Sequence, residues 1–508
     1  STSNRCSTIT MPSCPHSESL NHPHCQTFRR GILYKRWFPV SLLSYFYHEL
    51  DLCVIGVNRM IGDTSLARSP LTEGSIRNLV ERSRRRLATW FPAYLIAHYA
   101  KSQLWHASTL LFGFFLTEIC GIGARSMGWI MAASLLLNGL ADLLMGTWGH
   151  GRISDEAHAR RVQARGGPLT CVFFLLFCGT PFIATDARSA WALVMLLGFR
   201  VTYPLIDVPQ NTIPALLSLD DNARCSLLAH RNVASGVAAI AISVIAAPIL
   251  IRGGDLYRWM AWALLLSLFV CGSAWWLART PLAGETPRPD APVRPRDDLG
   301  FATILCALAM MIAASSAFRL IEPYYSAFVR GGSGLLLWAA VGGTISQPVW
   351  ACCRRRWSAF SSLIGAAVML AGAAGLLSSP LRSAPVGVVL AGMTFGIGSG
   401  GLWLMLWTAM TALAAQGSAT RHVGIFTCVS KTAQATAIVT AGHVLAASPY
   451  RLTMRDPWSP PSLMMAGALA AIALVCVVLA CVLAFNRTSS GGTSTTPRPA
   501  APTVRAPD

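Results

Sequence analysis

The stretch LIDVPQNTIPALLSLDDNARCSLLAHR, residues 205–231, determines how this chain is interpreted. It continues an apolar run that begins near Ser189, yet it places Asp207 and Asn211 among prolines where such a run should be most hydrophobic. Proline inside a helix removes a backbone N–H and leaves a carbonyl without its partner. A carboxylate inside a membrane segment is costly and usually marks a functional site. The stretch therefore predicts a membrane-spanning helix with a polar face.

The composition of the whole chain also indicates a membrane protein. Its 508 residues are 53% hydrophobic and only 12% charged, and their mean hydropathy is +0.49. Soluble domains carry roughly 25% charged residues. Apolar runs of about 20 residues recur along the chain, and this length matches the thickness of a bilayer core. Because the runs are too long and too uniformly apolar for barrel strands, they predict an all-α membrane protein.

The apolar runs predict about twelve transmembrane helices in two six-helix bundles. The helices are expected near residues 92–117, 127–148, 168–186, 190–213, 232–251, 258–278, 299–328, 334–352, 358–377, 384–414, 423–447 and 462–485. Between the sixth and the seventh helix lies a segment rich in proline and charge, which is typical of a flexible linker. Two six-helix halves around a central loop are typical of secondary transporters.

This division predicts five parts of the chain. Residues 88–279 and 299–486 form the two bundles, and residues 280–298 form a central cytoplasmic loop. Residues 1–87 are interpreted as a poorly ordered N-terminal cytoplasmic extension, although an interfacial helix is the other reading of their partly apolar stretch. Residues 487–508 have the composition of a disordered tail.

The arginines predict the orientation of the chain in the membrane. Fourteen of them lie in the loops after the even-numbered spans, against eight in the opposite loops. By the positive-inside rule, the even-numbered loops and both termini are cytoplasmic, and we expect a plasma (inner) membrane location. The formal net charge of +19 is then explained by anionic lipid at the membrane surface, without a nucleic-acid partner.

The sequence argues against catalysis, cofactors and metal sites. Asp220 and Asp221 resemble the paired aspartates of intramembrane prenyltransferases, but no second acidic cluster accompanies them. A GxxxxGK[ST] motif is absent, so ATP-driven transport is unsupported. The fifteen cysteines show no CxxC and no metal-ligand spacing, so they are interpreted as small packing residues.

Polar residues inside the predicted spans recur at helical spacing and therefore form stripes on helix faces. The stripes comprise Lys101, Trp105 and Ser108; Asn138 and Asp142; Arg200, Tyr203, Asp207 and Asn211; Arg319, Glu322 and Tyr325; and Thr427, Lys431 and Gln434. Stripes of both charge signs on helices from both halves indicate one water-accessible cavity. The other reading is a set of interhelical hydrogen bonds that only hold the bundle together.

Lysine is rare in this chain, and two of its three lysines fall in predicted spans. They are Lys101 and Lys431, the third being Lys35. An arginine does not simply replace a compact ammonium whose protonation responds to burial. Lys101 could also reach the interface along its aliphatic stem. Lys431 lies deeper, which favours a specific role.

Several of these segments resemble the glycoside–pentoside–hexuronide:cation symporters, the melibiose permease-like family of the major facilitator superfamily. The resemblance is carried by LADLLMG (140–146) with GHGRISDEAHARRVQARGGPL (149–169), by residues 205–231, by EPYYSAFVRGG (322–332) and by RHVGIFTCVSKTAQA (421–435). It covers roughly residues 90–485, in order and at matching intervals. It implies symport of a sugar, a glycoside or a similar small organic solute with a cation, by alternating access.

The resemblance and the stripes together assign candidate site residues. The candidate substrate-binding residues are Lys101, Ser102, Tyr203, Asp207, Asn211 and Arg231. The candidate cation-coupling residues are Asn138, Asp142 and Lys431. Lys431 is expected to pair with Asp142 across the two halves.

The chain departs from the family pattern at four of the compared positions. Asn138 replaces a carboxylate and Pro204 replaces a hydroxyl of the cation site, so sodium loses oxygen ligands and a proton is favoured. Ser102 and Asn211 replace a sugar-binding carboxylate and a stacking tryptophan, which argues against a galactoside. Two other functions stay open: a lipid or amphiphile transporter of the same fold, and a non-transporting receptor or scaffold.

Overall fold

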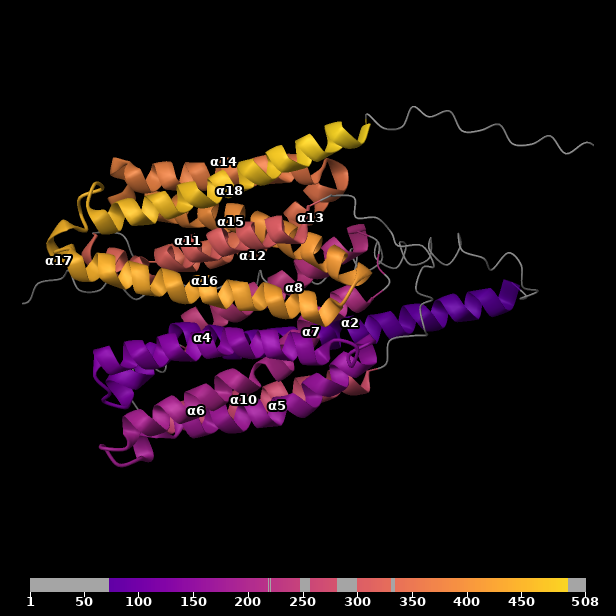
Figure 1. Cartoon of the computed structure of the whole chain (residues 1–508), viewed down its shortest axis with the longest axis horizontal. Helices are drawn as coiled ribbons and strands as arrows, with labels where there is room; N and C mark the ends of the chain where they lie inside the picture. The colour runs from indigo at the N-terminus through magenta and orange to yellow at the C-terminus, as the bar shows by residue number, and fades with distance from the viewer. Residues whose placement is uncertain are drawn as a thin grey trace, which may run out of the picture. The chain divides into compact units, whose positions relative to one another are not determined.

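The computed structural model describes residues 73–217, 219, 221–246, 256–280, 299–329 and 334–491. Within these ranges every regular element is a helix (Figure 1). They belong to one compact unit that runs from Cys53 to Asp508, whereas the other unit, Ser1–Leu52, lies outside the described residues. The predictions for residues 1–72, for most of the central loop and for the end of the tail also fall outside these ranges.

The helices of the first half follow one another with short connections. They are α2 (Glu73–Leu110), α3 (Phe112–Phe114), η2 (Phe115–Ile119), α4 (Ala124–Gly149), α5 (Glu156–Cys178), η3 (Thr180–Phe182), α6 (Arg188–Thr202), α7 (Pro204–Leu216), α8 (Asp221–Ala241), η4 (Ile242–Ala246) and α10 (Leu256–Arg279).

The helices of the second half are also joined by short connections. Its helices are α11 (Phe301–Phe328), α12 (Leu335–Ile345), α13 (Gln347–Arg356), α14 (Ala359–Ser378), η5 (Pro380–Ser383), α15 (Pro385–Gln416), α16 (Ala419–Ala447), α17 (Tyr450–Thr453) and α18 (Pro460–Gly491).

Eight spans in the described part of the chain are long and apolar enough to cross a membrane, with α6 and α7 forming one of them. A ninth results if α12 and α13, which are bent by 41° at their junction, count as a single span. Helices α2, α5 and α16 have 38, 23 and 29 residues and are also long enough, but they are more polar. Each predicted span therefore coincides with a helix or a helix pair, and the predicted helical membrane fold is confirmed.

Several helices extend beyond the apolar segments that predict them. Helix α2 begins at Glu73, α5 at Glu156 and α8 at Asp221, and α18 continues to Gly491. Residues 73–87 read EGSIRNLVERSRRRL, which is polar but rich in good helix formers. Hydropathy reports where a helix enters the bilayer, so it misses the polar turns outside.

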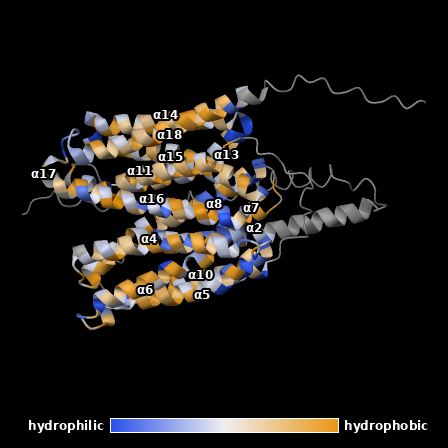
Figure 2. Cartoon of the chain, in the orientation of Figure 1, coloured by the Kyte–Doolittle hydropathy of each residue, from blue (hydrophilic) through white to orange (hydrophobic). Residues whose placement is uncertain are grey.

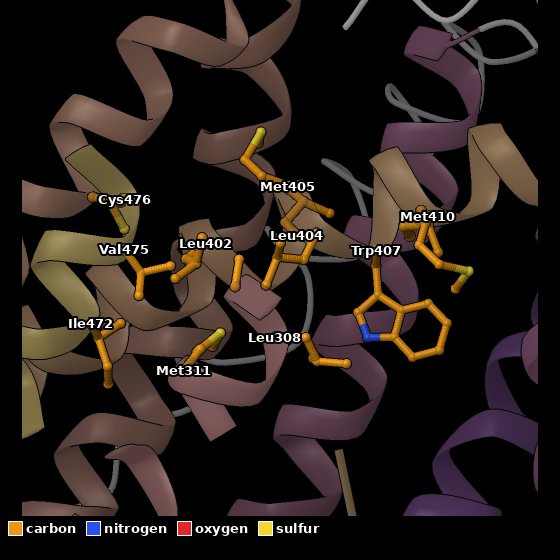
Figure 3. Close-up of a cluster of buried hydrophobic side chains, with 14 of the residues drawn as sticks. Leu308, Met311, Leu402, Leu404, Met405, Trp407, Met410, Ile472, Val475 and Cys476 are labelled. Carbon is orange, nitrogen blue, oxygen red and sulfur yellow. The ribbon is translucent and has the colours of Figure 1, made fainter. Parts of the chain in front are cut away.

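Each half has its own internal packing. In the first half α5 packs against α6, α7 and α10, and in the second half α14 packs against α15 and α18. Hydrophobic residues dominate the helices of both groups (Figure 2). Figure 3 shows part of the core of the second half, which includes Leu308 and Met311 of α11, Leu402 and Trp407 of α15 and Ile472 of α18.

The two halves meet where α4 lies along α16 and where α8 packs against α12 and α13 (Figure 1). A Cβ added to Gly146 of α4 would lie 2.9 Å from the Cα of Gly424 and from the carbonyl oxygen of Thr420 on α16. A Cβ on Gly424 would in turn lie 2.7 Å from the Asp142 carbonyl oxygen. Only glycine permits these two backbones to approach so closely.

The close contact continues to the ends of both helices. A Cβ on Gly149 would lie 3.3 Å from the Thr420 side chain, and a ring nitrogen of His150 lies 2.6 Å from the Ser418 hydroxyl. On α8, a Cβ at Gly236 would lie only 2.0 Å from the Thr344 hydroxyl oxygen. The halves are therefore in contact where the end of α4 meets the start of α16, and again where the later part of α8 meets the end of α12.

We expect Gly146→Ala to lower the melting temperature of the purified protein in detergent. The added methyl group meets backbone atoms that cannot rotate away, and overpacking of this kind costs about 1–3 kcal/mol. Gly128→Ala in the same helix is the matched control, because its Cβ would meet nothing within 4 Å. Equal melting temperatures of the two variants would contradict the close contact between α4 and α16.

Candidate functional site

Four buried charged side chains of alternating sign lie together between the halves. The Lys431 ammonium is 2.6 Å from the Asp142 carboxylate and 3.8 Å from the Asp207 carboxylate. The Lys101 ammonium is 2.8 Å from the other oxygen of Asp207. We call Asp142, Lys431, Asp207 and Lys101 the charge network. The pair expected between Asp142 and Lys431 is present.

The charge network joins four helices. Lys101 lies on α2, Asp142 on α4 and Asp207 on α7, all in the first half, whereas Lys431 lies on α16 in the second. The side chain of Asp142 has no exposed area, and the other three are 4–11% exposed. Buried ions lose hydration, so each needs its partner, and removing one partner strands the other charge.

Asn211 forms hydrogen bonds with both members of the Lys101–Asp207 pair. Its amide nitrogen donates to the Asp207 carboxylate at 2.9 Å, and its amide oxygen accepts from the Lys101 ammonium at 2.9 Å. The hydroxyl of Tyr203 donates to the main-chain carbonyl of Lys101 at 3.5 Å. Four predicted substrate-binding residues are therefore in contact with one another.

Aromatic rings cover the ammonium of Lys431. Its nitrogen lies 5.2 Å from the ring centre of Trp105 and 5.5 Å from that of Tyr203. The guanidinium carbon of Arg200 lies 5.5 Å from the same Trp105 ring, and Arg200 donates to the Ser108 hydroxyl at 3.1 Å. Cations over ring faces are stabilised by the ring quadrupole, more strongly when water is excluded.

A break between α6 and α7 determines where Asp207 points. Pro204 has no N–H, so the carbonyl of Arg200 one turn earlier cannot form its helical hydrogen bond. Asn138 on α4 donates its amide nitrogen to this carbonyl. The Thr170 hydroxyl on α5 donates to the carbonyl of Thr202 at 3.0 Å. The carbonyl of Arg200, which Pro204 leaves without its helical partner, is therefore satisfied by Asn138 of a neighbouring helix.

Asn138 therefore has a structural contact in addition to the coupling role that the resemblance implies. Its amide nitrogen holds α4 to α6, one turn from Asp142. Its amide oxygen is buried and has no hydrogen-bond partner among the described residues. Ser102 is buried on α2 but makes no hydrogen bond with any described residue, and the structure does not connect it to the charge network.

Arg231 lies beside the charge network without joining it. Its guanidinium carbon is 4.0 Å from the ring centre of Trp407, which belongs to α15 in the second half. Its side chain is 2% exposed, and its Nε and one terminal nitrogen have no hydrogen-bond partner among the described residues. Reasoning from the sequence missed Trp407, because the run LWLMLW around it is uniformly apolar.

The interior of α2 adds two further polar side chains that the sequence did not single out. A ring nitrogen of His98 lies 3.2 Å from the Gln210 amide oxygen, and the ring of Tyr94 is stacked near His98. His98 is spaced three residues before Lys101, so helical spacing could have placed it in the same stripe. Among the residues that the structure describes, no group of His, Cys, Asp and Glu could hold a metal ion.

The chain resembles known sugar transporters in its first half. Residues 93–294 match the family model for MFS/sugar transport proteins. A candidate glycoside/cation symporter of Escherichia coli K12 is 28% identical over 30% of this chain, and the isoprimeverose transporter of Lactiplantibacillus pentosus is 24% identical over 30%. The matched segment spans about a third of each relative, 34% and 33%.

The fold resembles that of solved transporters over most of the chain. A bacterial homologue of the iron transporter ferroportin, in an outward-facing state, covers 78% of this chain and 99% of its own, with a TM-score of 0.57 and 12% identity. The proton:xylose symporter XylE covers 80% of this chain and 96% of its own, with a TM-score of 0.50 and 12% identity. The expectation that the chain is not an enzyme is confirmed by these matches. The chain is thus a multi-pass membrane protein with the fold of the major facilitator superfamily, and its residues 93–294 resemble the MFS/sugar transport proteins.

Proposed function

We propose that this protein is a secondary active transporter that moves a sugar, a glycoside or a similar small organic solute together with a proton. The observation that carries the proposal is the charge network, because Lys431 from one half bridges Asp142 and Asp207 from the other. An ion pair that joins the halves can couple its own protonation state to their relative position. The names of the two relatives, a glycoside/cation symporter and an isoprimeverose transporter, support the class of solute.

Asp207, Lys101 and Asn211 are proposed to bind the solute. A carboxylate accepts hydrogen bonds from hydroxyl groups, and an ammonium and an amide donate them. In this structure the three side chains form hydrogen bonds and an ion pair with one another. A solute hydroxyl would therefore have to replace some of these contacts. This exchange favours a polyhydroxylated solute over an apolar one.

Asp142 is proposed to carry the coupling proton. When Asp142 is ionised, it neutralises Lys431 at 2.6 Å. Protonation of Asp142 would remove this attraction. Because the Lys431 ammonium already lies 3.8 Å from the Asp207 carboxylate, a small movement would bring it into contact with the proposed solute ligand Asp207. Sodium requires several oxygen ligands, but Asn138 offers a neutral amide oxygen in place of a carboxylate, the Arg200 carbonyl already accepts from the Asn138 amide nitrogen, and position 204 is a proline. These residues favour a proton over sodium.

We also propose that residues 88–279 and 299–486 form two bundles around a cytoplasmic loop, and that the protein lies in the plasma (inner) membrane with both termini cytoplasmic. With that orientation, the glycine contact between α4 and α16 lies on the cytoplasmic side. The arrangement supports an outward-facing state, in which the halves touch below the charge network.

The first test is uptake into proteoliposomes against a panel of neutral sugars and glycosides. We expect an inward proton gradient to drive uptake and sodium to have no effect. Asp142→Asn should abolish the dependence on the gradient, while exchange of bound solute persists. Asp186→Asn, at an exposed position between η3 and α6, should keep the gradient dependence. Uptake that sodium stimulates at constant pH would show that the proton assignment is wrong.

A second expectation concerns Asp207→Asn, which removes the charge and keeps the shape. We expect the affinity for the transported solute to fall about ten- to hundred-fold, since a hydrogen bond to a charged group contributes about 1.5–3 kcal/mol. The affinity is measured from the solute-dependent thermal shift of the purified protein, and size-exclusion chromatography checks that the variant is folded. Asp186→Asn, on an exposed loop, is the control. An unchanged affinity would reject Asp207 as a solute ligand.

A third expectation concerns the pair between the halves. Asp142→Asn and Lys431→Gln should each lower the melting temperature strongly, because breaking a buried pair costs about 3–5 kcal/mol. The double variant should be closer to the native protein than either single variant, since no charge is left unpaired. Additive effects in this double-mutant cycle would argue against a direct interaction.

A further inference from the structure

The interface between the halves has two sides, and corresponding spans build both of them. On the first side α4, the second span of the first half, lies along α16, the fifth span of the second half. On the second side α8, the fifth span of the first half, packs against α12 and α13, which together are the second span of the second half. The halves of this fold are parallel repeats related by an axis along the membrane normal, so equivalent positions can be compared between the two sides.

A hydrogen bond between two amides lies on the second side. The amide nitrogen of Asn232 on α8 donates to the amide oxygen of Gln347 on α13 at 2.9 Å, and both side chains are buried. Asn232 follows the first residue of α8 by eleven residues, and Lys431 follows that of α16 by twelve. Gln347 precedes the last residue of α13 by nine residues, and Asp142 precedes that of α4 by seven. The neutral amide pair therefore stands near the position that is equivalent to the ion pair.

Gln347 is held in place at the break between α12 and α13. Pro348 follows it and has no N–H, so the helical hydrogen bonds are interrupted here. The amide nitrogen of Gln347 donates to the carbonyl of Gly343, one turn earlier, at 3.0 Å. A Cβ on Gly400 of α15 would lie 2.7 Å from the same nitrogen, so α15 confines the side chain as well. The amide oxygen is thereby kept in a position to accept from Asn232.

We propose that the hydrogen bond between Asn232 and Gln347 is a second latch between the halves, which holds its side of the interface closed independently of the Asp142–Lys431 ion pair. The inference rests on the proposed transport cycle and adds a positioning pair to it. An amide pair carries no charge, so it keeps its hydrogen bond when the charge of Asp142 changes. Loss of the ion pair would therefore release only the first side. The halves part at this end only when the amide pair breaks as well.

Hydrogen–deuterium exchange of the purified full-length protein, read by mass spectrometry, measures how often the halves part, because protected amides exchange through such openings. Asn232→Leu and Gln347→Met roughly keep the size of each side chain and remove the hydrogen bond. Each variant should raise the exchange rate about ten-fold in residues 221–241 and 347–356. The same rise is expected in residues 419–424 at the start of α16, which lie on the first side of the interface.

The double variant tests whether the two side chains act through one bond. It should raise the exchange rate no more than either single variant does. Asn232→Ala adds no volume and gives the same comparison if the leucine does not pack. Asn222→Ala, at an exposed position on α8, is the matched control and should leave the exchange unchanged. Size-exclusion chromatography checks that every variant is folded.

The proposal is overturned if exchange rises in α8 and α13 while the start of α16 is unchanged, because the bond would then be only a local one. Additive effects in the double variant, or unchanged exchange in every variant, would overturn it too. The measurement requires neither solute nor gradient, so its outcome is separable from that of the transport proposal. If the variants open both sides but no solute accumulates in proteoliposomes under any gradient, the latch stands and the transport function is rejected. If a gradient drives uptake but the start of α16 is unaffected, the transport function stands and the latch is rejected.

Discussion

The structure depends on one buried ion pair that crosses between its halves. Asp142 and Lys431 lie 2.6 Å apart, and neither tolerates the loss of the other in a low-dielectric interior. The pair requires α4 and α16 to run side by side at close range. Gly146 and Gly424 permit this approach, because a Cβ on either would clash with the opposite backbone. The electrostatic and the steric requirements therefore act on the same two helices.

The polar face of the fourth span shows how membrane helices tolerate a break. Pro204 removes one backbone hydrogen bond, and the lipid phase offers no water to replace it. Neighbouring helices supply the partners instead, through Asn138 and Thr170. The break is thus stabilised by tertiary contacts, and it allows Tyr203 and Asp207 to face the same space as Lys101.

The sequence predicted much of this arrangement because periodicity and hydropathy are local signals. The twelve apolar segments and the stripes that contain Asp142, Asp207 and Lys431 follow directly from spacing. It did not predict that Asn138 binds a main-chain carbonyl, nor that Trp407 covers Arg231, because which faces meet is decided by packing between distant segments. The polar start of α2 was missed for a different reason, since helix propensity and membrane insertion are separate properties.

The glycine contact has a consequence for the speed of conformational change. Gly146 and Gly424 touch through main-chain atoms, with no side chains interlocked between them. Glycine has no side-chain entropy to lose or regain, so separating the helices here requires no rotamer exchange. Dispersion between two smooth surfaces also falls off steeply once a gap opens. In the transport cycle proposed above, the two bundles would part at this point as rigid bodies, and the ion pair above the glycines would have to break as they part.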